Sequence, residues 1–336
     1  MIRPTSGLIG ALTTVAVITA VMAQPTKKAP PSPPTPAPAP APAPAPNATS
    51  NSDQSNIDVA YGAFQRGFYL TAFNEAAKRA QQNDPAAMTL LGELYAQGLG
   101  VARDDSKAAQ WYKMAAAKGD RDAIFALAMF SFQGRAGPRS VDDAARLLEA
   151  AAKLGHPSAA YDLGLLYIQG QQFPQDFKRA AELFAVAAEA GNSEAQYALA
   201  TMYKEGRGAP KDIGKATRLM EQASVGGNID AMVEFAIAKF NGDGTTKDEA
   251  AAARLFLKAA HLGNAVAQNR LARILMSGRG MPADPTEAIK WHIVAKAGGN
   301  SDPDLDVFAS KQSPAARDAA DKAAKKWLST VAARRP

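Results

Sequence analysis

A single glycine recurs along most of this chain at a constant spacing. It stands at Gly119, Gly155, Gly191, Gly227, Gly263 and Gly299, and each of these positions follows the previous one by 36 residues. A strict period in this range is typical of tandem repeat proteins, in which each unit packs mainly on its neighbours. The spacing therefore predicts consecutive units without insertion or deletion, and it limits the possible folds more than any other feature of the sequence.

The first complete unit, residues 87–119, has the pattern of two helices. Ala87, Leu91 and Tyr95 are four residues apart and would line one face of a first helix, here called helix A. Glycines then interrupt the pattern, and Asp104 is a predicted N-cap for a second helix, helix B. Each unit is thus expected to be a helical hairpin.

The recurring glycine is predicted to end helix B, because helices commonly stop at a glycine in the left-handed conformation. An Asp or Asn follows that glycine in five of the six units, as in Gly119-Asp120 and Gly263-Asn264. These side chains favour the N-cap position, so each should begin the next helix A. In the remaining unit His156 takes this place, before a proline that a first helical turn tolerates.

The pattern resembles the Sel1-like repeat, a relative of the tetratricopeptide repeat with a longer loop between its two helices. Residues 87–119 read Ala-x-x-x-Leu-Gly-x-x-Tyr-x-x-Gly-x-Gly-Val-x-x-Asp-x-x-Lys-Ala-x-x-Trp-Tyr-x-x-Ala-Ala-x-x-Gly, and copies with substitutions follow in register to Gly299. The resemblance implies an all-α fold, a right-handed α/α solenoid of tandem hairpins. It also implies a protein that binds other proteins and catalyses no reaction.

The N-terminal 56 residues differ in composition from the repeats. Arg3, the largely apolar stretch 8–20 and the small residues before position 24 are typical of a signal peptide, and cleavage is expected after Ala23. The alternative is an uncleaved membrane anchor, for which the apolar stretch is short, since a span takes about 20 residues. Residues 24–56, rich in proline and alanine and then polar, are expected to form a disordered, extended linker.

The sequence predicts two caps around the repeats. The expected organisation is a signal peptide at 1–23, the linker at 24–56, an N-terminal capping hairpin at 57–83, six repeats at 84–299 and C-terminal capping helices at 300–336. The first cap keeps helical spacing without the repeat signatures, as terminal units often do because one of their faces meets water. Asp302-Pro303 and Ser313-Pro314 each pair an N-cap residue with proline, which predicts two further helices.

The binding surface is expected on the A helices, which line the concave surface of tetratricopeptide-type arrays. By that analogy two variable positions per unit point into it, two and five residues after the repeated leucine. The first series is Glu93, Met129, Leu165, Thr201, Ile237 and Arg273, and the second is Ala96, Phe132, Ile168, Lys204, Phe240 and Met276. The second, third and fifth units are apolar at both positions, and an apolar helix surface is either buried or offered to a partner.

The candidate partner-binding residues follow from these series and their neighbours. They are Phe125, Met129, Phe132, Tyr161, Leu165, Ile168, Tyr197, Ile237 and Phe240. The alternative is that these side chains form packing core. Tyr161 and Tyr197 in particular occupy a position where the resembling family often has an aromatic residue for packing.

The sequence offers little catalytic or ligand chemistry. It contains no cysteine and only three histidines, which the repeat explains as turn and helix residues, so we expect no metal site and no cofactor. Carboxylate pairs such as Asp142 and Asp143 stand at helix starts, where the helix dipole favours them. The net charge of +6 is modest and forms no dense basic face with interleaved aromatics, so nucleic acid is not an expected partner.

These observations predict a non-enzymatic scaffold or regulator, periplasmic or secreted, without an integral membrane span after signal cleavage. The resemblance implies a protein partner, such as a sensor-kinase ectodomain or an envelope enzyme. The competing interpretation is a structural or peptidoglycan-associated factor of the cell envelope. An enzyme would need a site with perturbed titratable groups, which the sequence does not display.

Overall fold

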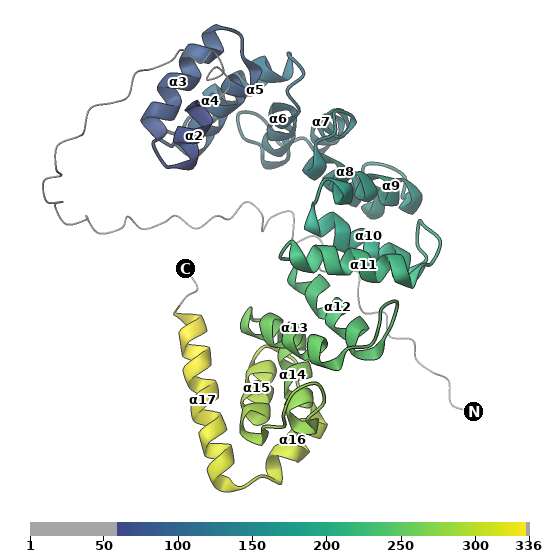
Figure 1. The fold of residues 1–336 in the computed structure, drawn as a ribbon. Helices are drawn as coiled ribbons and strands as arrows, with labels where there is room; N and C mark the ends of the chain where they lie inside the picture. The colour runs from purple at the N-terminus through teal and green to yellow at the C-terminus, as the bar shows by residue number, and fades with distance from the viewer. Residues whose placement is uncertain (1–58, 334–336) are drawn as a thin grey trace, which may run out of the picture. The chain divides into compact units, whose positions relative to one another are not determined.

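The computed structural model describes residues 59–333, so the predicted signal peptide and linker lie outside the described residues. Regular structure in this range consists of sixteen helices, without a strand, which confirms the all-α prediction. Figure 1 shows the helices following one another as hairpins. Residues 59–328 belong to one compact unit.

Two helices precede the repeats and two follow them. They are α2 (Val59–Gln65), α3 (Tyr69–Gln81), α16 (Pro303–Ser310) and α17 (Pro314–Ala332). The A helices are α4 (Pro85–Gln97), α6 (Arg121–Gln133), α8 (Pro157–Gln169), α10 (Ser193–Glu205), α12 (Ile229–Asn241) and α14 (Ala265–Ser277). The B helices are α5 (Asp105–Ala116), α7 (Val141–Lys153), α9 (Phe177–Glu189), α11 (Ile213–Val225), α13 (Glu249–His261) and α15 (Pro285–Ala297). Each A helix packs against the B helix of its own repeat, and that B helix packs against the next A helix.

The recurring glycine ends helix B as predicted. All six glycines have a positive φ, between 78° and 94°. At the first of them, the Gly119 N–H donates to the Ala116 carbonyl at 2.9 Å and the Asp120 N–H donates to the Ala115 carbonyl at 3.2 Å. This is the Schellman arrangement, which satisfies the last carbonyls of a helix and requires a left-handed residue.

The residue after the glycine also begins the next helix. The Asp120 carboxylate accepts a hydrogen bond from the Ala123 N–H at 2.8 Å. In the third repeat His156 does the same through its ring, because Nδ1 accepts from the Ala159 N–H at 3.1 Å. Burial lowers the pKa of His156, which favours the neutral ring that this bond requires. His156 is therefore the N-cap of α8.

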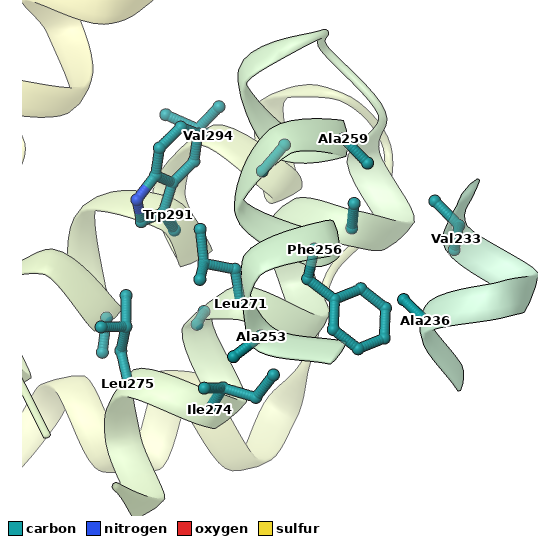
Figure 2. Close-up of a cluster of buried hydrophobic side chains, with 14 of the residues drawn as sticks. Val233, Ala236, Ala253, Phe256, Ala259, Leu271, Ile274, Leu275, Trp291 and Val294 are labelled. Atoms are coloured by element: carbon teal, nitrogen blue, oxygen red, sulfur yellow. The ribbon is translucent and has the colours of Figure 1, made fainter. Parts of the chain in front are cut away.

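The core consists mainly of alanines, with larger aliphatic and aromatic side chains among them. Figure 2 shows part of this core in the last two repeats, where Ala253 and Phe256 of α13 lie with Leu271 and Ile274 of α14. Trp291 of α15 is 1 % exposed. Trp327 of α17 packs edge-on against Trp291, with ring centroids 5.6 Å apart. Small residues let the helices approach closely, so each repeat needs few large side chains to fill its interior.

Glycine in the Leu-Gly pair leaves space for an aromatic ring of helix B. A Cβ on Gly92 would lie 2.5 Å from Tyr112 Cε1, and a Cβ on Gly164 would lie 2.6 Å from Phe184 Cε1. In the second repeat the same two positions hold Ala128 and Leu148. Glycine accompanies a ring in the first and third repeats and alanine accompanies a smaller side chain in the second, whereas the fifth repeat combines Ala236 with Phe256.

The substitution Gly92→Ala tests this pairing. Alanine normally stabilises a helix by about 1 kcal/mol over glycine, but here its Cβ meets the Tyr112 ring, and overpacking costs about 1 to 3 kcal/mol. We expect a lower free energy of unfolding, measured by urea titration followed by circular dichroism. The double variant Gly92→Ala with Tyr112→Leu copies the second repeat and should recover stability. A stabilised single variant would contradict the packing described.

Candidate binding surface

The nine predicted residues lie on four A helices with different degrees of burial. Leu165 of α8 is 5 % exposed and belongs to the interior of the free protein. The other eight are partly buried, neither core nor fully in solvent. The predicted surface therefore consists of side chains that pack on one side and meet solvent on the other.

Two of the predicted aromatic residues have ring partners inside the protein. Phe125 of α6 stacks on the capping His156, with ring centroids 4.3 Å apart. Tyr161 of α8 tilts against Phe184 of α9 at 5.6 Å. Burial raises the pKa of Tyr161 to about 12, and the charges of Asp162 and Glu194 add to this effect. Both rings thus contribute to packing between and within repeats.

The structure brings Ile237 and Phe240 of α12 together in a hollow. Ile274 and Met276 of α14 and Phe256 of α13 complete its apolar lining, and its volume is about 360 Å³. Figure 2 shows Phe256 and Ile274 among the buried side chains of the core in these repeats. The hollow lies between the A helices of the fifth and sixth repeats, and Asn241, Ser277 and three arginines complete its lining.

Arginines border this hollow, and two of them are held by ion pairs. The Arg279 guanidinium lies 4.5 Å from the centroid of the Phe240 ring and pairs with Glu249. Hydrogen bonds from Arg279 and then Lys247 lower the pKa of the Glu249 carboxyl to about 2. Arg273 pairs with an oxygen of Asp302 at 2.6 Å. The rim of the hollow is thereby ordered by charge pairs between neighbouring elements.

Two of the nine predicted residues line the hollow, and the other seven do not. Its lining includes Ile237 and Phe240 but none of the candidates on α6, α8 or α10. Met276 and Arg273 also line it, and they belong to the same two series of positions that selected the candidates. Arg270 and Arg279 were not singled out, and the sequence alone does not distinguish them from other surface cations.

A carboxylate that the sequence analysis did not single out lies among the apolar candidates. Asp162 follows Tyr161 in the middle of α8 and is partly buried. Within residues 59–333 no hydrogen bond or ion pair reaches its carboxylate. Burial raises the pKa of Asp162 to about 7. The only hint in the sequence is that the corresponding positions in the first, second and fourth repeats hold Leu90, Ala126 and Ala198.

The described residues show neither metal ligands in a cluster nor a membrane-crossing helix. No group of three or more His, Asp or Glu side chains within residues 59–333 is placed to hold a metal ion. None of the helices in the same range combines the length and the apolar character needed to cross a bilayer. The described surface offers apolar contact, the ion-paired arginines at the hollow and the unpaired carboxylate of Asp162.

Comparison with known proteins gives consistent matches over the repeats. The family model of the Sel1 repeat matches six consecutive segments, residues 85–120, 121–156, 157–192, 193–228, 229–264 and 265–300. None of the curated proteins matches this chain.

Solved structures of two bacterial proteins share the fold. A Sel1 repeat protein from Oxalobacter formigenes is 28 % identical, with a TM-score of 0.63, and the alignment covers 72 % of this chain and all of that one. The protein c5321, described as a protective antigen present in uropathogenic Escherichia coli strains displaying an SLR fold, is 25 % identical, with a TM-score of 0.55. That alignment covers 78 % of this chain and 64 % of c5321.

The titration of Asp162 gives a test of its environment. A folded-state pKa of about 7 lies above the ordinary aspartate value, so the stability associated with the neutral carboxyl is complete below about pH 4 and is lost as the pH rises through 7. Asp162→Asn stays neutral and should be more stable than the parent at pH 8, on the order of 4 kcal/mol, with little difference at pH 4. Urea unfolding across this range measures it. A difference that does not change with pH would contradict the assignment.

Proposed function

Because this chain belongs to the Sel1 repeat family, whose fold generally mediates protein–protein interaction, we propose that it is a non-catalytic scaffold that holds a partner protein on its A helices. The partner contributes an extended or helical segment whose apolar side chains enter the surface between neighbouring A helices. No chemical step is part of this function.

The observation that carries the proposal is the hollow at Ile237 and Phe240. Its volume of about 360 Å³ is near the lower end of ligand pockets, which span about 300 to 1,000 Å³. Its apolar lining and fixed arginine rim suit one or two side chains of a peptide. Burying such side chains in an apolar recess is how most interfaces obtain their binding free energy.

The A helices α6 and α8 offer a second apolar region. Met129, Phe132 and Ile168 lie there, each partly buried. Leu165 of α8 is buried in the interior of the free protein. The proposed partner segment gains further apolar contact from these side chains, and the hollow is its main anchor.

We place this function in the bacterial envelope. The support is the signal-like pattern of residues 1–23 and the absence of cysteine, which suits an oxidising compartment without requiring one. The E. coli protein of similar fold is described as a protective antigen. A structural role beside peptidoglycan enzymes is the competing outcome, to be distinguished by the identity of the captured partner.

Photo-crosslinking from the hollow tests the proposal. A benzoylphenylalanine in place of Phe240 should crosslink a defined partner in envelope extracts, identified by mass spectrometry. Ile237→Glu places a charge in the apolar recess and should weaken capture at least tenfold, which corresponds to about 1.4 kcal/mol or more. A sensor-kinase ectodomain among the products supports a regulator, and a cell-wall enzyme supports the structural role.

The control is an equivalent substitution away from the A helices. Val225 at the end of α11 is 86 % exposed, so Val225→Glu should leave capture unchanged. Melting temperatures of all variants separate lost binding from lost folding, and Phe240→Ala serves where Ile237→Glu proves unstable. Equal capture by folded hollow variants and the parent chain would refute the proposal.

A further inference from the structure

Asp162 lies where the candidate surface is otherwise apolar. Asp162 follows Tyr161 on α8 and lies three residues before the buried Leu165. No side chain within residues 59–333 donates a hydrogen bond to it or forms an ion pair with it. Burying part of a carboxylate without a partner costs free energy, so such a group is unusual in a surface built for packing alone.

The repeat register shows which interaction is missing. Two repeats later, the position of Asp162 holds Glu234, and Lys204 of the preceding A helix pairs with Glu234 at 2.7 Å. The position of Lys204 corresponds, two repeats earlier, to Phe132. The equivalent positions therefore hold a satisfied ion pair in repeats four and five, and the apolar Phe132 and the unpaired carboxylate of Asp162 in repeats two and three.

Asp162 has no cationic partner among residues 59–333. Glu194 is the other acidic group that acts on the adjacent Tyr161 ring. Burial raises the pKa of Asp162 to about 7, and no cation among residues 59–333 offsets this effect. A basic side chain brought by another molecule would satisfy the carboxylate and supply what Lys204 supplies to Glu234.

We propose that Asp162 is the recognition point for a lysine or arginine of the partner segment, with apolar neighbours of that residue contacting Met129, Phe132 and Ile168. This inference rests on the proposed function, because it assumes that the A helices hold a partner segment. It adds the chemical class of that segment, basic and apolar together. A metal ion is a poor alternative, because no further acidic or histidine side chain in the described range joins Asp162 in a cluster.

Peptide selection on the full chain tests the inference. A phage-displayed random peptide library is selected on the parent chain, and the enriched peptides are synthesised with their basic residue intact or replaced by glutamine. We expect enriched peptides to carry Lys or Arg beside large apolar residues. Replacing that residue by glutamine should weaken binding to the parent at least tenfold, measured by fluorescence anisotropy.

Two variants connect the preference to Asp162. In Asp162→Asn, peptides with lysine and with glutamine should bind equally, within about twofold. In the control Glu234→Gln, which alters the carboxylate already paired with Lys204, the tenfold preference should persist. Asparagine has nearly the shape of aspartate, so loss of the preference reports the charge rather than the packing.

The outcomes separate this inference from the proposed function. Selected peptides that lose affinity on Met129→Glu but show no preference for a basic residue would overturn the inference alone. A preference that survives in Asp162→Asn would also overturn it. If no peptide is selected, or if binding is indifferent to both Met129→Glu and Ile237→Glu in folded protein, the proposed function fails and the inference fails with it.

Discussion

The structure depends on the junction between helix B of one repeat and helix A of the next. At Gly263 and Asn264, the Asn264 N–H closes helix B on the Ala259 carbonyl at 3.1 Å, while its side chain caps the next helix at the Ala267 N–H at 2.9 Å. Asn264 thus satisfies a backbone group at the end of helix B and another at the start of the next helix A. Because a shift of either helix relative to Asn264 would break its bond to that helix, the junction helps keep the repeats in register.

Because the repeats keep a constant register, the position of a residue in the sequence gives its place on the A-helix surface. Residues 36 apart occupy equivalent places, so a substitution in one repeat changes one place on the A-helix surface without moving the rest. Lys204 and Glu234 form an ion pair in the fourth and fifth repeats. The equivalent positions of the second and third repeats hold Phe132 and the unpaired Asp162. A repeat scaffold can in this way keep its core while its surface takes on new partner chemistry.

The fold was largely predictable, and the candidate surface only partly. Helices, glycine stops and the Asp104 cap follow from residues close in sequence, and the structure confirms them. Ile237 and Phe240, which belong to the two series of variable positions, line the hollow. The same series also selected Leu165, which is buried, because periodicity shows which face of a helix a residue lies on but not how deeply its neighbours cover it.

The sequence by itself determined the period, the helix pairs and the turns, since each depends on hydrogen bonds spanning three to five residues. Only the tertiary structure decided which apolar side chains form a recess and which charges are satisfied. Those outcomes depend on residues about thirty positions apart on neighbouring helices, as Lys204 and Glu234 are. Asp162 became a functional candidate for this reason: its isolation exists only once the second and third repeats are packed together.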